Sequence, residues 1–171
     1  RVAAVELDGD AAREVAALDV LAGQVVVLDR APDGDLVETQ RRDVGEFPGF
    51  LTTGDIDADG YTDLLVLDAD HSRVLLLYGE PGGTFAEAVA LGYEIDTLRA
   101  AMPDLDGDGQ LDLVGLDGAS RLWWRRNLGG RVFGPGQWAH AGLGPSLLAL
   151  GDLDGDLDVD VVVGCRVDQS L

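Results

Sequence analysis

The chain has no lysine, little cysteine and no long apolar run. All twelve of its basic residues are arginines, set against 32 acidic residues, so the formal net charge is −20. Such a charge repels phosphate groups, which disfavours nucleic acid and anionic membrane surfaces as partners and favours a metal cation. No run of about 18 apolar residues is present, which excludes a transmembrane helix and membrane insertion.

Cysteine occurs once, at Cys165, so no internal disulfide can form. The residue lies in the apolar run VDVVVGCRV, which predicts a buried and unreactive thiol. A chain of 171 residues in which 46% are hydrophobic can still build a folded core, so disorder is not expected despite the charge.

Many of the acids fall in one nine-residue pattern. Its complete form is DIDADGYTD at residues 55–63, and DLDGDGQLD at residues 104–112 repeats it. Both copies carry acids at positions 1, 3, 5 and 9 and a glycine at position 6. Four carboxylates on one short loop are unfavourable unless a cation shares the space, so the pattern predicts a metal-binding loop.

Two altered copies bring the total to four. DLDGDLDVD at residues 152–160 has Leu157 in the glycine position, and ELDGDAARE at residues 6–14 has Ala11 there and glutamates at both ends. The copies start 49, 49 and 48 residues apart. A fixed period of this size indicates an array of supersecondary units, because a composition bias would not place acids in register.

Calcium suits this donor set, because it binds about six to eight oxygens and carboxylates on alternate residues of a tight turn can converge on it. The carbonyl of position 7 would add a ligand, and glycine at position 6 permits a positive φ. In the two complete loops the predicted ligands are Asp55, Asp57, Asp59, Tyr61 and Asp63, and Asp104, Asp106, Asp108, Gln110 and Asp112. In the fourth loop they are Asp152, Asp154, Asp156, Asp158 and Asp160, with weaker binding because of Leu157. In the first loop they are Glu6, Asp8, Asp10, Ala12 and Glu14, at a site expected to bind weakly or stay empty.

An EF-hand begins in the same way but needs a bidentate glutamate at position 12 and helices on both sides. Here position 12 is Val66, Gly115 or Val163, and short β-branched apolar runs follow each loop. These runs predict strands over 49–54, 62–69, 72–79 and 84–91 in the second repeat and over 97–103, 111–117, 119–127 and 131–139 in the third.

Four strands in about 49 residues are typical of a β-propeller blade. The sequence therefore predicts an all-β chain, residues 1–171 forming one partial propeller of four-stranded antiparallel blades. The repeats cover 1–48, 49–96, 97–144 and a truncated 145–171. Propellers close with about four to eight blades, so three and a half blades predict a fragment of a larger propeller, for example a seven-bladed one, or an incompletely known sequence; assembly with a second copy is an alternative.

With this motif, period and strand order, the units resemble FG-GAP or VCBS-type repeats, the blades of integrin-α-like propellers. The resemblance implies calcium in the D-x-D-x-D-G-x-x-D loops that join the first two strands of each blade, and a face that binds a partner. The literal Phe-Gly…Gly-Ala-Pro string is absent, which places the chain nearer the broader VCBS-like group than the integrins.

The sequence thus predicts a calcium-stabilised, non-enzymatic propeller segment of an extracellular, cell-surface or periplasmic protein. Its expected partners are a protein or glycan ligand, in recognition or adhesion, and the remaining propeller blades. The alternative is a lectin or a carbohydrate-active enzyme, such as a polysaccharide lyase, built on the same propeller. For that alternative Trp123 and Trp124 are candidate sugar-binding residues, although packing between blades for one of them and stacking on arginine for the other is the favoured explanation.

Overall fold

The computed structural model of the chain is all-β. It describes residues 2–7, 14–69, 72–91 and 96–166, and none of these residues is helical. The described ranges accordingly contain no helix that is long and apolar enough to cross a membrane. The chain divides into two compact units, residues 1–95 and 96–171.

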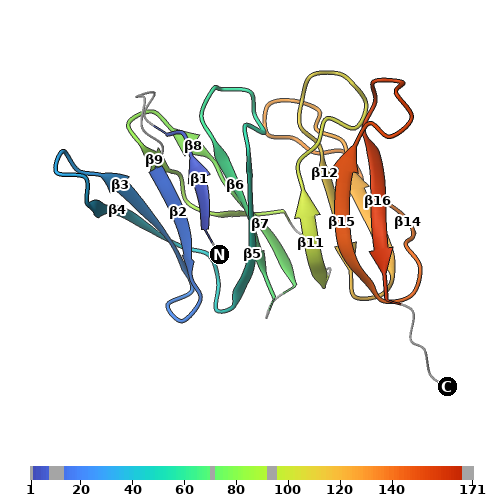
Figure 1. Ribbon diagram of the computed structural model, residues 1–171, viewed down its shortest axis with the longest axis horizontal. Helices are drawn as coiled ribbons and strands as arrows, with labels where there is room; N and C mark the ends of the chain where they lie inside the picture. The colour runs from blue at the N-terminus through green and yellow to red at the C-terminus, as the bar shows by residue number, and fades with distance from the viewer. Residues whose placement is uncertain (1, 8–13, 70–71, 92–95, 167–171) are drawn as a thin grey trace. The chain divides into compact units, whose positions relative to one another are not determined.

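The first unit contains two four-stranded antiparallel sheets (Figure 1). The strands of the first sheet follow chain order: β1 (Val2–Val5), β2 (Glu14–Asp19), β3 (Gln24–Arg30) and β4 (Leu36–Asp43). The second sheet runs β5 (Pro48–Gly54), β6 (Asp63–Asp68), β7 (Arg73–Leu77) and β10 (Val89–Ala90). A small ladder of β8 (Gly79–Glu80) and β9 (Thr84–Phe85) lies between β7 and β10 in the chain.

The second unit repeats this plan. One antiparallel sheet contains β11 (Thr97–Ala101), β12 (Leu113–Asp117), β13 (Arg121–Arg125) and β14 (Gln137–His140), again in chain order. β15 (Pro145–Gly151) and β16 (Asp160–Cys165) form a two-stranded sheet. The predicted all-β fold with four-stranded antiparallel propeller blades is confirmed, and we number the sheets as blades one to four.

Within the first unit the two blades pack through apolar faces. Val25 and Val27 of β3 belong to the same buried cluster as Leu75 and Leu77 of β7 and the ring of Phe85. β6 is buried along its whole length, which explains its unbroken apolar sequence. Burial of each such aliphatic side chain contributes about 1.5–3 kcal/mol, so this interface stabilises the blade pair.

The innermost strands of neighbouring blades also contact one another. β1 contacts β5 in the first unit, and β11 contacts β15 in the second. Each unit therefore stacks its two blades in the same way, first strand against first strand, as propeller blades do around an axis.

The fourth strand of the second blade is broken, where the sequence predicts one continuous strand over 84–91. The Phe85 N–H donates to Gln40 Oε1 at 2.8 Å, and the Phe85 carbonyl accepts from Gln40 Nε2 at 3.1 Å. These backbone groups thus bond to a side chain of the first blade, and only β10 pairs with β7. In the third blade the fourth strand is likewise shorter than predicted, since only Gln137–His140 forms β14.

The prediction of a buried thiol at Cys165 is wrong. Cys165 ends β16 and is exposed, and its Sγ donates a hydrogen bond to the Ala141 carbonyl at 2.8 Å. Its counterpart in the second blade, Asp68 at the end of β6, is 1% exposed because β7 covers it. Within the described residues no third strand covers β16, so the thiol remains accessible.

Candidate metal-binding loops

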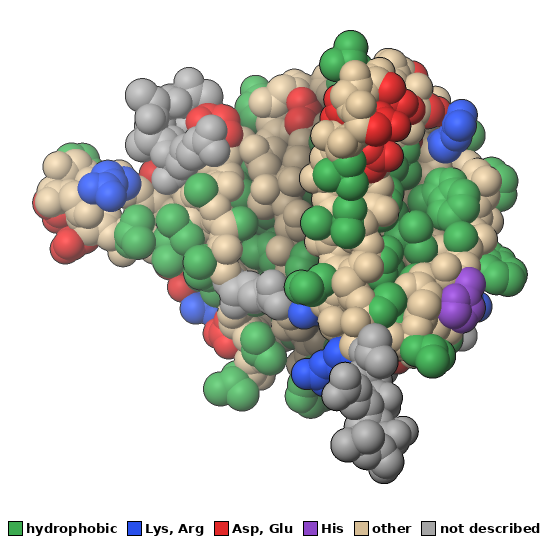
Figure 2. All heavy atoms as spheres, turned by 45° about the vertical axis from the view of Figure 1, so that its right-hand side comes forward, with side chains coloured by type: hydrophobic (Ala, Val, Ile, Leu, Met, Phe, Trp, Pro, Cys, Tyr) green, Lys and Arg blue, Asp and Glu red, His purple; other side chains and the backbone are tan. Residues whose placement is uncertain are grey.

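Three acidic loops join the first and second strands of their blades. Residues 55–63 connect β5 to β6, residues 104–112 connect β11 to β12, and residues 152–160 connect β15 to β16; the ninth residue lies at or next to the start of the following strand. Figure 2 shows acidic side chains gathered at one end of the second unit. The loops are thus held between paired strands, where the repeat predicts them.

Each loop bends through a positive φ at position 6. Gly60 and Gly109 have φ of +92° and +88°, as their glycine identity predicts. Leu157 takes the same conformation, with φ of +76°, although a side chain there is strained by about 1–2 kcal/mol. The fourth loop therefore keeps the shape of the other two at a cost in stability.

Position 4 also has a positive φ, which the sequence reasoning missed. The residues there are Ala58, Gly107 and Gly155, with φ of +58°, +72° and +82°. Glycine in two of the three copies is the signal that could have revealed this second bend. Two left-handed residues separated by one position turn the loop tightly enough to bring alternate side chains together.

The carboxylate at position 1 stabilises the turn by accepting hydrogen bonds from backbone N–H groups of the same loop. Asp55 accepts the N–H groups of Asp59 at 3.1 Å and of Gly60 at 2.9 Å. Asp104 and Asp152 accept equivalent N–H groups of their own loops at 2.7–3.2 Å. Such bonds from an aspartate to the following backbone explain why each loop begins with this residue type.

The carboxylate at position 9 connects the base of the loop to the neighbouring strands through two hydrogen bonds. Asp63 is fully buried, and its two oxygens accept the N–H groups of Ile56 and Gly79, each at 2.7 Å. Asp112 makes the same pair of contacts, with Leu105 at 3.0 Å and Asn127 at 2.7 Å. Because Gly79 and Asn127 follow the third strand of their blades, this acid ties the loop to three strands.

Burial makes these two acids harder to ionise. Loss of hydration raises the pKa of Asp63 to about 6, even though its two N–H donors lower it, and the charges of Asp57 and Asp59 raise it further. The pKa of Asp112 is raised for the same reasons, with burial first. A bound cation would reverse this effect by favouring the charged carboxylates.

In each loop three of the four predicted carboxylates come together, with one oxygen of each lying within 4.8 Å of the others. The groups are Asp55, Asp57 and Asp63; Asp104, Asp106 and Asp108; and Asp152, Asp154 and Asp160. Oxygens that surround one calcium ion at about 2.3–2.6 Å lie up to about 5 Å apart, so this donor set fits calcium.

The other predicted ligands lie outside these groups. Asp59 and Asp156 each accept a backbone N–H two residues further on, and Asp112 accepts the two N–H groups described above. The carboxylates of Asp59, Asp112 and Asp156 and the carbonyls of Tyr61, Gln110 and Asp158 stay predictions as ligands. In the fourth loop the Asp156 carboxylate raises the pKa of Asp158 through a shared hydrogen bond and through its charge.

Part of the first copy can also be placed. Asp8, Asp10 and Ala12 lie outside the described residues. Glu14 is 2% exposed, and its Oε2 accepts the Leu7 N–H at 2.8 Å, which is the contact that position 9 makes in the other loops. The longer side chain of Glu14 thus still makes the hydrogen bond found at the base of the other loops. Its role as a calcium ligand stays a prediction.

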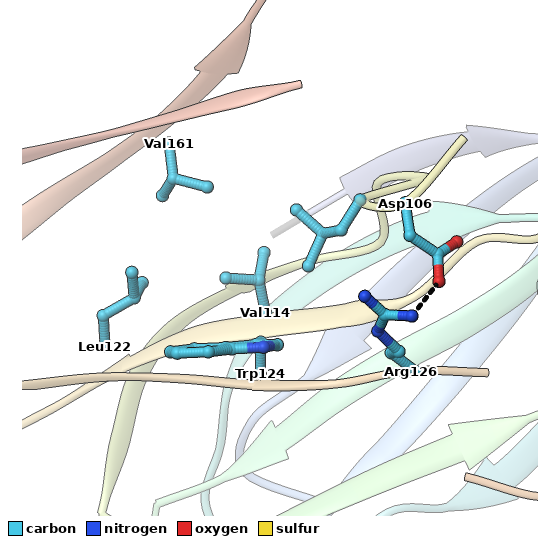
Figure 3. Close-up of a pocket in the computed structure, with 7 residues that line it drawn as sticks. Asp106, Val114, Leu122, Trp124, Arg126 and Val161 are labelled. Atoms are coloured by element: carbon cyan, nitrogen blue, oxygen red, sulfur yellow. Dashed lines mark ion pairs between the residues drawn. The ribbon is translucent and has the colours of Figure 1, made fainter. Parts of the chain in front are cut away.

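Arg126 lies beside the third loop, which the sequence reasoning did not foresee. Its Nη1 is 2.8 Å from Oδ2 of Asp106, one of the three convergent carboxylates (Figure 3). Arg126 directly follows β13, so only the pairing of β12 with β13 brings it near the loop. The guanidinium offsets part of the negative charge there.

The two tryptophans of β13 have different environments. Trp123 is 4% exposed, and a Cβ on Gly115 of the paired strand would come within 2.4 Å of its ring. Trp124 is half-buried and lines a hollow together with Arg126. A role of either residue in ligand binding stays a prediction, and the burial of Trp123 leaves its ring almost no accessible surface.

Repeated antiparallel sheets, three of them four-stranded, with described acidic loops between the first two strands of blades two, three and four, define a repeat protein of the β-propeller type. A family model described as FG-GAP-like repeat matches residues 55–115 and again residues 104–163. The two matches cover well over half of the chain, and the chain belongs to this family. Each match starts at the first residue of an acidic loop and ends within the second strand of the next blade. No curated protein matches the chain.

Proposed function

We propose that the chain is a calcium-stabilised, non-enzymatic scaffold in which loops 55–63, 104–112 and 152–160 each hold one Ca²⁺. The observation that supports this best is the convergence of three carboxylates in all three loops. The same two-bend backbone in each loop supports it as well. A repeated backbone that gathers negative charge needs a compensating cation, and the donors are all oxygens, which hard cations prefer.

In such a site the four acidic positions of the loop would have different roles. Position 1 shapes the turn, positions 3 and 5 bring further carboxylates toward its centre, and position 9 ties the loop to the neighbouring strands. Bound calcium would supply positive charge at that centre. Because position 9 reaches the end of the third strand, the bound ion would stabilise the blade as well as the loop.

The wider role that we propose is recognition of a protein or glycan in an extracellular, cell-surface or periplasmic protein. FG-GAP-like repeats are typical of such proteins, and sites of this kind are matched to near-millimolar calcium. The strongly acidic surface also suits such an environment, since divalent cations there reduce its self-repulsion.

Isothermal titration calorimetry with CaCl₂ tests the proposal on the whole chain. We expect saturable binding, with a contribution from each of the three loops. Asp104→Asn, which removes a convergent carboxylate from the third loop, should remove one binding event. Asp35→Asn, in the exposed β3–β4 turn, is the matched control and should leave the titration unchanged. An unsaturable heat signal, or equal titrations for the two variants, would contradict calcium binding at the loops.

A further inference from the structure

One stretch of the second unit differs in charge from the rest of the chain. Residues 118–151 contain four arginines and no acid, so this stretch carries a net charge of +4, which leaves −24 for the remainder. It also contains all three tryptophans. In Figure 2 the acidic side chains of the second unit gather at the end that carries the loops, and hydrophobic, arginine and histidine side chains appear on the side below them. The stretch includes β13 and β14, so an anionic ligand would be repelled least there.

The outermost strand of the third blade, β14, presents a tryptophan to solvent. All four residues of β14 are exposed, and among the described residues it pairs with β13 alone. Trp138 is 67% exposed, whereas Trp123, directly opposite on β13, is 4% exposed. By the strand pairings, the positions that correspond to Trp138 in the first two blades are Arg41 and Ala90. The repeat therefore does not require a large ring at this position.

Two arginines of β13 lie on the same face as Trp138. Strand alternation places Arg121 and Arg125 diagonally across from Trp138, one on each side of it. The Arg125 guanidinium reaches β14, because a Cβ on Gly136, two residues before Trp138, would come within 3.3 Å of Arg125 Nε. Arg125 Nη1 also donates a hydrogen bond to the Gly134 carbonyl at 2.9 Å. A guanidinium is thus held close to one side of the exposed indole.

The other side of the indole carries a second pair of polar groups, Arg121 and the His140 opposite it. Arg121 Nε donates to the Asp117 carboxylate, which is 2% exposed, while the Arg121 side chain is 45% exposed. His140 is exposed, and its Nδ1 accepts the Gly142 N–H at 3.0 Å. In the neutral ring the proton is therefore on Nε2, which can donate to a ligand. We call these four residues, Arg121, Arg125, Trp138 and His140, the Trp138 strip.

An aromatic ring with a guanidinium group on each side can recognise a sugar that carries a carboxylate. The C–H face of a sugar ring is apolar and can pack on an indole, and a guanidinium binds a carboxylate through two parallel N–H donors. The Trp138 strip consists of four side chains, whereas a protein partner usually covers about 20–30 residues on each side, so a chain of sugars matches its size better. Nucleic acid fits less well, because the net charge of −20 repels its closely spaced phosphates.

We propose that the Trp138 strip binds an acidic polysaccharide that contains uronate rings. The Trp138 indole stacks on one sugar ring, the guanidinium groups of Arg121 and Arg125 bind carboxylates on either side of it, and His140 Nε2 donates to a hydroxyl. This inference rests on the recognition role proposed above and adds the surface and the class of glycan. The strip includes no residue of the acidic loops, so it does not require calcium as a ligand.

The first test compares two hexasaccharides of galacturonic acid, one with free carboxylates and one with methyl esters. Each is titrated into the whole chain and followed by tryptophan fluorescence and calorimetry. We expect saturable binding of the acid form and at least about tenfold weaker binding of the ester, which cannot pair with a guanidinium in the same way. No binding of the acid form, or equal binding of the two, would overturn the proposal. Equal binding of hexaglutamate or of a thymidine hexanucleotide would overturn the assignment to a sugar.

Matched variants of β13 and β14 locate the site. Trp138→Ala should weaken binding of the acid form by at least about tenfold, and Trp138→Phe, which keeps a ring and guards against misfolding, by a few-fold. Arg125→Gln should weaken binding of the acid form by about tenfold and leave binding of the ester within about twofold. Gln137→Ala, exposed on the opposite face of β14, is the control and should bind within about twofold of the unmodified chain. Equal affinities for Trp138→Ala and Gln137→Ala would overturn the assignment.

The effect of calcium is separated by running each titration in EDTA and in millimolar calcium. We expect Trp138→Ala to weaken binding in both buffers. A chain that binds calcium at its loops but no hexasaccharide would overturn only the present inference, and one that binds the hexasaccharide but no calcium would overturn only the calcium sites. Binding seen in calcium alone and unchanged by Trp138→Ala would indicate that the ion bridges the sugar to the loops, and would overturn a site at the Trp138 strip.

Discussion

At the scale of single residues, the backbone conformation of position 6 decides how easily an acidic loop forms. Gly60 and Gly109 take a positive φ without steric cost, whereas Leu157 takes it with a side chain that is 92% exposed. The leucine therefore adds strain to the fourth loop and gains almost no packing in return. Replacing Leu157 therefore changes the backbone strain but buries or exposes little additional apolar surface.

We predict that Leu157→Gly stabilises the chain by roughly 1 kcal/mol, because relief of the strained φ outweighs the greater freedom of glycine in the unfolded state. Calcium affinity of the fourth loop should rise as well. Thermal unfolding with and without calcium measures both effects. Leu153→Gly, in the same loop and without a positive φ, is the control and should destabilise. The prediction fails if both variants lower the melting temperature.

The ionisation of Asp63 makes the stability and the calcium affinity of its loop depend on pH. Burial raises its folded pKa to about 6, above the value of about 3.9 in an unfolded chain. Between these values the folded state binds more protons than the unfolded state, so the contribution of Asp63 to the unfolding free energy falls as the pH rises from about 4 to 6 in metal-free protein. Calcium needs the charged carboxylate, so calcium affinity should rise over the same interval.

Carboxyl ¹³C NMR of the metal-free chain tests this directly. We expect the Asp63 signal to titrate near pH 6 and the second loop to bind calcium more weakly at pH 5 than at pH 7. A midpoint near 4 for Asp63 would show that burial does not control its ionisation.

At the scale of strands and sheets, paired positions on neighbouring strands set the shape of the third blade. Gly115 of β12 pairs with Trp123 of β13, and the indole lies over the glycine so closely that a Cβ would meet it at 2.4 Å. Glycine is therefore needed here for close packing, and its φ is not positive. The ring is only 4% exposed, so an added methyl would have to displace buried atoms.

We predict that Gly115→Ala destabilises the chain by about 1–3 kcal/mol, because the added methyl forces the indole or the strand to shift. Gly151→Ala on β15 is the matched control, since a Cβ there meets nothing within 4 Å and the φ is not positive. It should change stability by less than about 0.5 kcal/mol. Urea unfolding followed by tryptophan fluorescence measures both variants. Equal midpoints would contradict the close packing of Trp123 on Gly115.

At the scale of the whole molecule, the large negative charge makes stability depend on bound cations. The chain carries a net charge of −20, and three loops each gather three carboxylates. An ion that binds only the folded state stabilises it by about 2.7 kcal/mol for each site at a free concentration one hundred times the Kd. Calcium should therefore act on the stability of the chain more than any single substitution.

We predict that EDTA lowers the melting temperature by several degrees and that millimolar calcium restores it. Magnesium at the same concentration is the control for screening of the net charge, because it prefers a smaller octahedral shell with bound water. Scanning calorimetry in the three buffers distinguishes the effects. Equal melting curves in EDTA and in calcium, or equal curves in calcium and magnesium, would contradict specific binding at the loops.

The sequence was sufficient to predict features that depend on neighbouring residues. The turn in residues 55–63 is set within nine residues by Asp55, Asp63 and Gly60, and its repetition identified the blades and the family. Strand existence and order followed from short apolar runs between the loops. These features are readable because their determining contacts lie close together in the chain or recur at a constant spacing.

Other features were decided only by the tertiary structure. Packing of one blade on the next diverts the backbone of Phe85 to Gln40 and breaks the fourth strand. Strand pairing brings Arg126 to Asp106 and lays Trp123 over Gly115. The absence of a covering strand in the described residues leaves Cys165 exposed in an apolar stretch. Each depends on residues distant in sequence, so local composition and spacing could not determine it, whereas the acidic loop contains most of its own determinants.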